Sequence, residues 1–215
     1  MRYSPFGDRA PVTFALCFLL VAGLALAVSG DDPLLPGDRL AAEAAESVHG
    51  PWLTERMRAL TDLGSGVLVA VVLVFASLGL AANRKWNELA ITVTGALIIA
   101  LGVPELKDGI GRARPDDGLV SSESLAYPSG HAAHATVYVY LAVLIAHLSP
   151  ESRRLGLLFA VTIALCLAIG LSRVYLGAHY LSDVVGGWAF GVGAFCFWAV
   201  FSLARDRLRH NLARE

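Results

Sequence analysis

The sequence predicts an all-α integral membrane protein: a bundle of six transmembrane helices with a short helical segment at the outer membrane interface. Three observations support this fold class. First, 56% of the 215 residues are hydrophobic and only 16% are charged, whereas a soluble domain has about 25% charged residues. Second, the mean hydropathy is +0.61. Third, six apolar runs have the length of about 17 to 25 residues that a helix needs to cross a bilayer.

The six runs follow one another without an internal repeat or a break in composition, so we expect a single domain over residues 1–215. The first run also fits the core of a signal peptide, because Arg2 and Arg9 precede it and Ala27-Val28-Ser29 fits a cleavage site. Its length favours a retained helix. In chain order, the runs are Val12–Val28, Ser65–Ala82, Glu88–Leu106, Ser129–Leu148, Leu155–Leu171 and Val184–Ala204.

Basic residues are concentrated on one predicted side of the membrane. Cytoplasmic segments carry an excess of Lys and Arg, so we expect both termini in the cytoplasm. The bias toward Ala, Leu, Val and Arg is typical of a GC-rich bacterial source, so the membrane is expected to be a bacterial cytoplasmic membrane. Ten of the 17 basic residues fall on the side of the termini if the runs cross alternately: Arg2, Arg9, Arg84, Lys85, Arg153, Arg154, Arg205, Arg207, Arg209 and Arg214.

The segment Gly30–Asp62 is acidic and partly amphipathic. Helices of this kind lie in the plane of the membrane interface, and Trp52 suits the headgroup level. We therefore expect interrupted interfacial helices on the outer surface, near the mouth of any site there; a solvated loop with helical turns is the alternative. The residues expected on the apolar face are Leu40, Ala44, Val48, Trp52, Leu53, Met57 and Leu60.

Three short motifs lie at the ends of apolar runs, and alternate crossing places all three on the predicted outer face. Charge at such positions is costly unless it serves a function. The motifs are Lys107-x6-Arg114-Pro115, Pro128-Ser129-Gly130-His131 and Ser172-Arg173-x5-His179-x3-Asp183.

The residue types in these motifs suit the binding and cleavage of a phosphate ester. Cations are needed around the phosphoryl oxygens, and Arg and Lys provide them as planar forks and point charges. Ser129 and Gly130 precede a predicted helix, whose first N–H groups form an anion seat. His131 and His179 supply imidazoles that titrate near neutrality. Asp183 follows His179 by four residues, so on a helix the two would share a face.

Together and in this order, the motifs resemble the complete signature of the type 2 phosphatidic acid phosphatase family, which is related to vanadium haloperoxidases. The resemblance covers Lys107–Asp183 and implies no metal or other cofactor. It implies that His179 is the nucleophile and forms a phosphohistidine, that Asp183 orients it, and that His131 protonates the leaving group. It also implies that the phosphoryl oxygens are bound by Lys107, Arg114, Ser129, Gly130 and Arg173.

The expected function is therefore that of a membrane phosphatase acting on a lipid phosphate or diphosphate at the outer face. Candidate substrates are undecaprenyl diphosphate, phosphatidylglycerol phosphate and phosphatidic acid. A phosphotransferase using the same histidine and a non-enzymatic transporter or binding protein for lipid anions are the alternatives. The net charge of -1 argues against nucleic-acid binding, and no feature indicates an obligate protein partner.

Other polar residues near the motifs are expected to have structural roles. We expect Arg112 to be a solvated charge, His134 to be packed or to face a cavity, and Ser172 to cap or pack a helix as readily as to contact phosphate. The cysteines Cys17, Cys166 and Cys196 lie within apolar runs and are expected to be small buried hydrophobes.

Overall fold

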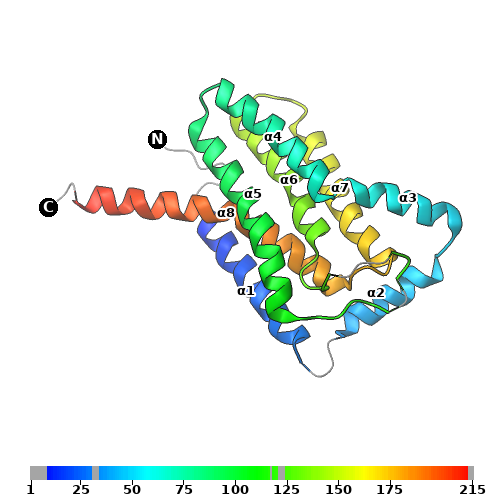
Figure 1. The fold of residues 1–215 in the computed structure, drawn as a ribbon. Coiled ribbons are helices and arrows are strands. Elements are labelled where there is room, and N and C mark those ends of the chain that lie inside the picture. Colours follow the sequence, from blue (N-terminus) through cyan, green and yellow to red (C-terminus); the bar gives the residue numbers. More distant parts are fainter. Residues whose placement is uncertain (1–8, 31–33, 117, 121–123, 213–215) are drawn as a thin grey trace.

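The protein is built from α-helices, and no strand occurs in the residues that the structure describes (Figure 1). A computed structural model describes residues 9–30, 34–116, 118–120 and 124–212. The predicted all-α fold class is confirmed. Within these residues the helices are α1 (Ala10–Val28), α2 (Pro36–Ser47), α3 (Pro51–Asp62), α4 (Gly66–Ala82), α5 (Trp86–Ile110), α6 (Gly130–Leu148), α7 (Leu155–Tyr175) and α8 (Leu181–Leu212).

Five of these helices are long and apolar enough to cross a membrane: α1, α5, α6, α7 and the Leu181–Trp198 part of α8. A sixth crossing arises when α3 and α4 are taken as one span with a bend of 40° between them. The six expected spans therefore correspond to five continuous helices and one bent pair. The second expected span, Ser65–Ala82, differs from the structure: α4 has only 17 residues and counts as a crossing only together with α3.

Three spanning helices extend beyond the apolar runs that predicted them. The added turns carry Lys107 at the end of α5, Arg173 at the end of α7 and Asp183 at the start of α8. The predicted runs end where these charged residues begin, because hydropathy records only side chains. A helix continues past them because each further residue adds a backbone hydrogen bond, whatever its side chain. Lys107, Arg173 and Asp183 therefore lie on helix ends, whereas Arg114 and His179 lie in the segments between helices.

Helix α6 lies at the centre of the bundle, in contact with α4, α5, α7 and α8, while α1 packs along α8. Its Tyr140 ring stacks on Phe195 of α8 with centroids 4.0 Å apart, and the Tyr140 hydroxyl lies 2.7 Å from the Thr92 hydroxyl of α5. Burial of such side chains supplies the packing energy that holds α5, α6 and α8 together. These three helices are the frame of the site.

The first half of α8 packs so closely against α6 that only glycine fits at two of its positions. A methyl group at Gly187 would overlap the Ser129 carbonyl oxygen and lie 3.0 Å from the Ala132 methyl. A methyl group at Gly191 would lie 2.6 Å from the Ala133 carbonyl oxygen. Small residues permit this approach of helix backbones. The start of α6 is thereby held against the start of α8.

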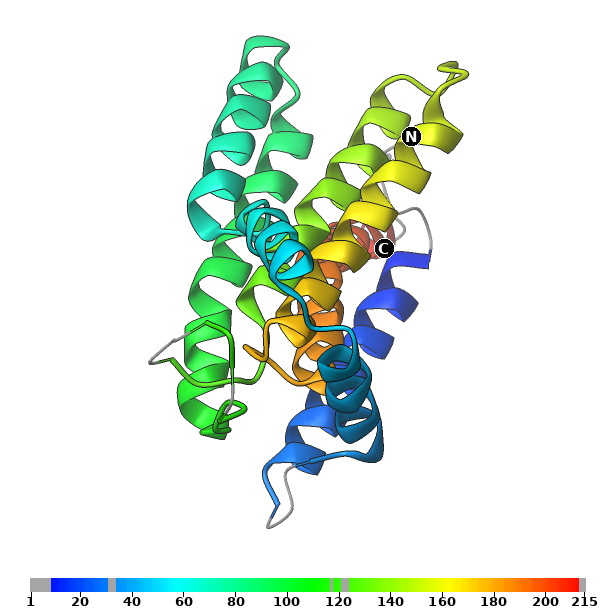
Figure 2. The same ribbon diagram turned by 90° about the vertical axis from the view of Figure 1, so that its right-hand side faces the viewer.

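Helices α2 and α3 lie on one side of the bundle, beside the ends of α7 and α8 (Figures 1 and 2). Much of the apolar face expected for them points away from the protein, since Leu40 and Trp52 are each 68% exposed. This exposure is compatible with helices that lie in the membrane interface. The side of α2 that faces the protein buries the carboxylate of Asp38 instead.

Candidate active site

The three motifs meet at one end of the bundle. The Ser129 N–H donates to the Asp183 carbonyl oxygen at 2.9 Å, joining the second motif to the third. Arg114 of the first motif donates to the Ala178 carbonyl oxygen and lies 3.2 Å from Nε2 of His179. Helices that are far apart in the sequence therefore contribute to a single site.

The chain segment after α5 places Arg114 in this site. Gly111 ends α5 in the left-handed region, with φ of 71°, which glycine adopts without a steric penalty. The chain then turns back, and the Ala126 N–H donates to the Arg112 carbonyl oxygen at 2.8 Å. Arg114 also donates to the hydroxyl and carbonyl oxygens of Ser124. The segment is thus held along the mouth of the site.

Ser129 caps the N-terminus of α6. Its hydroxyl accepts a hydrogen bond from the Ala132 N–H at 3.5 Å, and the side chain is fully buried. Gly130 is the first residue of α6 and His131 the second. The first turn of a helix presents N–H groups and the positive end of its dipole. An anion in the site would meet both.

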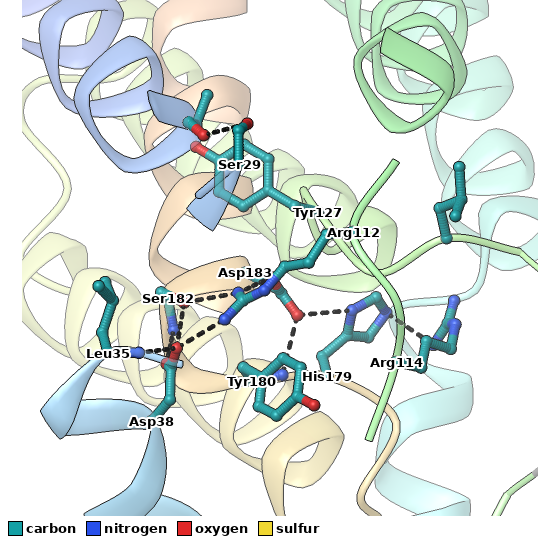
Figure 3. A network of polar contacts seen from close by, with 12 residues as sticks. Ser29, Leu35, Asp38, Arg112, Arg114, Tyr127, His179, Tyr180, Ser182 and Asp183 are labelled. Carbon is teal, nitrogen blue, oxygen red and sulfur yellow. Dashed lines mark hydrogen bonds and ion pairs between the residues drawn. The ribbon is translucent and has the colours of Figure 1, made fainter. Parts of the chain in front are cut away.

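His179 is the most enclosed imidazole among the site residues, 3% exposed (Figure 3). Its Nε2 faces an Arg114 nitrogen at 3.2 Å, and its Nδ1 lies 3.5 Å from an Asp183 oxygen. Because a guanidinium only donates, Nε2 is the acceptor and the proton is on Nδ1, toward Asp183. Burial lowers the pKa of His179 to about 4; the Asp183 carboxylate opposes this decrease, and the Arg114 charge adds to it. The ring is therefore neutral at pH 7, with its lone pair on Nε2.

Asp183 reaches His179 by a different route from the expected shared helical face. His179 precedes α8, which begins at Leu181. The Asp183 carboxylate turns back over the start of the helix and accepts the Tyr180 N–H at 2.8 Å, as an acid in the first turn of a helix does in a capping box. The same oxygen lies closest to Nδ1 of His179. Helix capping, rather than helical spacing, brings the pair together.

The expectation that Arg112 is a solvated charge is wrong. Arg112 is 3% exposed, and its guanidinium bonds the carboxylates of Asp183 and Asp38, the latter at 2.8 Å. It also donates to the Ser182 hydroxyl at 2.7 Å, and the Tyr180 ring lies 4.3 Å away. A buried cation requires such partners. No local sequence pattern indicates this arrangement, because Asp38 lies on α2, far from Arg112 along the chain.

The remaining cations surround the same space. Lys107 donates to the Leu125 carbonyl oxygen. Arg173 is buried and donates to the Thr61 hydroxyl at 3.1 Å. Lys107, Arg114 and Arg173 are close enough for their charges to interact. A cavity of about 490 Å³ opens beside Lys107. All three cations of the motifs therefore lie at one site.

Gly64, between α3 and α4, packs against the start of α6 at His131. A methyl group at Gly64 would lie 3.1 Å from the His131 carbonyl oxygen, and the half-buried His131 remains at the start of α6. One turn later, His134 lies 3.3 Å from the Gly64 carbonyl oxygen and lines an apolar groove, as expected. Ser172 donates to the Ile169 carbonyl oxygen within α7, which is a packing role.

A metal-binding cluster is not evident in the described part of the chain. Its His, Cys, Asp and Glu side chains form no group of three or more that could hold a metal ion. None of the three cysteines is in a disulfide; Cys166 and Cys196 are buried, and Cys17 is partly buried. The site offers cations, imidazoles and the carboxylates of Asp183 and Asp38.

Similarity to known proteins agrees with this geometry. The family model described as the PAP2 superfamily matches residues 86–208. The chain is 32% identical to phosphatidylglycerophosphatase B of Bacillus subtilis over 210 residues, which cover 94% of this chain and 98% of that protein. It is 38% identical to the lipid A 1-phosphatase of Rhizobium etli over 123 residues, covering 51% of this chain and 48% of the relative.

Solved structures show the same arrangement of helices. The crystal structure of a transmembrane PAP2 type phosphatidylglycerolphosphate phosphatase from Bacillus subtilis superposes with a TM-score of 0.78 at 30% identity, covering 89% of this chain and 96% of that one. The LpxE structure from Aquifex aeolicus shares the fold, with a TM-score of 0.59 at 20% identity over 78% of this chain and 96% of that one. The chain therefore belongs to the PAP2 superfamily and is an integral membrane phosphatase.

Proposed function

We propose that the protein hydrolyses a lipid phosphate or diphosphate through a phosphohistidine on His179. The observation that carries this proposal is the orientation of the His179 ring. Its lone pair on Nε2 faces Arg114, and its Nδ1 faces Asp183. A nucleophile directed at a cation, with a carboxylate behind it, is the arrangement that nucleophilic catalysis on a phosphoryl group needs.

In the proposed first step, Nε2 of His179 attacks phosphorus and the bond to the leaving oxygen breaks. His131 donates a proton to that oxygen. Asp183 stabilises the positive charge that develops on the His179 ring. In the second step, His131 accepts a proton from water, the water oxygen attacks phosphorus, and the P–N bond breaks. Inorganic phosphate leaves and the free imidazole is restored.

The three cations and the start of α6 would hold the phosphoryl oxygens during both steps. Arg114 and Lys107 donate to carbonyl oxygens at the mouth of the site, and we propose that a phosphoryl group takes over these donors. Charge-assisted bonds to phosphate are stronger than neutral ones. Ser129 and Gly130 would contribute the cap of α6, where N–H groups face an anion. Arg173 would bind from the side of α7.

The lipid tail would lie in the apolar groove of about 510 Å³ formed by α4, α5 and α6, with His134 in its wall. Apolar walls discriminate weakly among hydrocarbon chains. The substrate to test first is phosphatidylglycerol phosphate, because the relative that is similar over 94% of this chain is a phosphatidylglycerophosphatase. We further propose that the termini are cytoplasmic, that the site faces outward, and that the chain works as a single domain without a metal.

The proposal is tested by phosphate release from purified protein in detergent with EDTA present. The panel contains phosphatidylglycerol phosphate, undecaprenyl diphosphate and phosphatidic acid. We expect turnover of at least one lipid without added metal. If no lipid of the panel releases phosphate, hydrolysis of these lipids is refuted. Mass spectrometry of the same reactions would then detect any phosphorylated acceptor.

The Asp183→Asn variant should be slower than wild type without being inactive. Loss of the carboxylate leaves the developing charge on His179 without a partner, which lowers kcat by about 10²- to 10³-fold, the scale of one preorganised electrostatic contact. The measurement is kcat on the preferred lipid of the panel. Glu55→Gln, an exposed acid on α3, is the matched control. A wild-type kcat in Asp183→Asn would remove Asp183 from the mechanism.

A further inference from the structure

We propose that Asp38, on the peripheral helix α2, is a positioning residue of the active site that acts on His179 through Arg112 and Asp183. The proposal rests on the proposed function, since it takes His179 as the nucleophile. None of the three motifs contains Asp38. It lies on α2, whereas the first motif begins near the end of α5, with α3 and α4 between them. Its place in the site follows from its contacts.

Asp38 is 1% exposed and fully bonded (Figure 3). One carboxylate oxygen accepts the Ser182 N–H at 2.7 Å. The other accepts the Ser182 hydroxyl at 2.7 Å and an Arg112 nitrogen at 2.8 Å. It also caps its own helix by accepting the Leu35 N–H at 3.3 Å. Helix α2 thus buries a carboxylate against α8 while its Leu40 is exposed.

Asp38 and Asp183 occupy equivalent positions. Each is the third residue of its helix, and each accepts the N–H of the residue that precedes that helix. Arg112 lies between the two helix starts and bonds both carboxylates. A contact is therefore made at every link from Asp38 to Arg112, to Asp183 and to His179. A single cation is shared between two acids.

The sharing of Arg112 between two acids determines the electrostatic field that His179 experiences from Asp183 and its partners. With both acids ionised, the Asp38–Arg112–Asp183 group carries one net negative charge. Without the Asp38 charge, Arg112 is left to neutralise Asp183, and the field at His179 becomes more positive. An added positive field disfavours the protonated imidazole and lowers its pKa. A less basic imidazole is a weaker nucleophile.

A purely structural role makes a different prediction. If Asp38 only anchors α2, its loss reduces the amount of folded, active protein but does not change the ionisation of His179. The acidic limb of the kcat/KM profile reports the group that must be deprotonated in the free enzyme, here His179. The pH at which kcat/KM falls on the acidic side therefore distinguishes the two roles, whereas the amount of remaining activity does not.

The experiment measures kcat and kcat/KM against pH for Asp38→Asn on phosphatidylglycerol phosphate in detergent micelles. We expect kcat to fall about tenfold, the scale on which outer partners of a reactive group act, with KM unchanged. The acidic limb should move to lower pH, because the pKa of His179 falls. Glu43→Gln removes an exposed acid from the same helix and should leave the profile unchanged.

The double variant Asp38→Asn/Arg112→Gln decides between the roles. It removes one charge of each sign, so the net charge beside His179 returns to that of wild type and the acidic limb should move back toward its wild-type position. In this variant Asp183 keeps the Tyr180 N–H and the His179 ring as partners. An unshifted limb in Asp38→Asn, or a further loss without recovery of the limb in the double variant, would overturn the positioning role. If His179→Ala remains active, the proposed function itself fails, whatever the Asp38 variants show.

Discussion

Phosphate release by the His179→Ala variant is expected to fall by about 10⁵-fold or more, as for removal of a catalytic nucleophile. No other described imidazole combines burial, an Arg114 contact at Nε2 and a carboxylate at Nδ1. Water would have to replace the ring as nucleophile, without its position or its lone pair. The folded protein should persist, because alanine leaves no unpaired charge.

The measurement is a rapid-quench reaction with phosphorus-labelled lipid, stopped in alkali so that a P–N bond survives. Wild type should carry label on the protein during turnover, and His179→Ala should carry none. His147→Ala is the matched control, because His147 lies at the far end of α6, 3.7 Å from Glu88. Near-normal turnover by His179→Ala would exclude the covalent mechanism.

Gly187→Leu is expected to remove both folded protein and activity. The side chain would be forced onto the Ser129 carbonyl oxygen and the Ala132 methyl. Overpacking of this kind costs about 1–3 kcal/mol or more, and relief by moving α8 would separate His179 from the start of α6. Both responses abolish the site: one through loss of the fold, the other through loss of its geometry.

The measurement is the thermal unfolding midpoint in detergent, together with phosphate release. Gly23→Leu on α1 is the matched control, since Gly23 is exposed and a Cβ atom there has no neighbour within 4 Å; it should change neither property. If Gly187→Leu kept a wild-type midpoint and rate, close approach of α6 and α8 would not be required for the site.

Much of the fold is predictable because the bilayer imposes a length on each apolar run. The run Leu155–Leu171 predicts α7, and the run Ser129–Leu148 predicts α6 almost to the residue. The gathering of the motifs at one end is predictable as well, because helices that cross alternately return to the same face. The ends of the helices were harder to predict, since hydropathy does not include the backbone hydrogen bonds that continue into charged turns.

Tertiary pairings between distant residues were not predictable. The sequence favours a surface charge at Arg112, whereas the acids that bond it in the structure, Asp38 and Asp183, come from α2 and α8. The orientation of α2 was not predictable either. Its sequence shows that Leu40 and Asp38 lie on different sides, but only the packing against α8 shows that the acid is the buried side.

The close contact of α6 with α8 has a consequence for how this protein can be altered. The start of α6 is fixed to the start of α8 by main-chain atoms, through the Ser129 N–H and the Asp183 carbonyl oxygen, and by glycines that leave no room for variation. Side chains of α4 such as Val74 and Leu78 line the apolar groove and take no part in that contact. For the tail position proposed above, substitutions on this wall should change tail preference while the geometry of the reaction centre is kept.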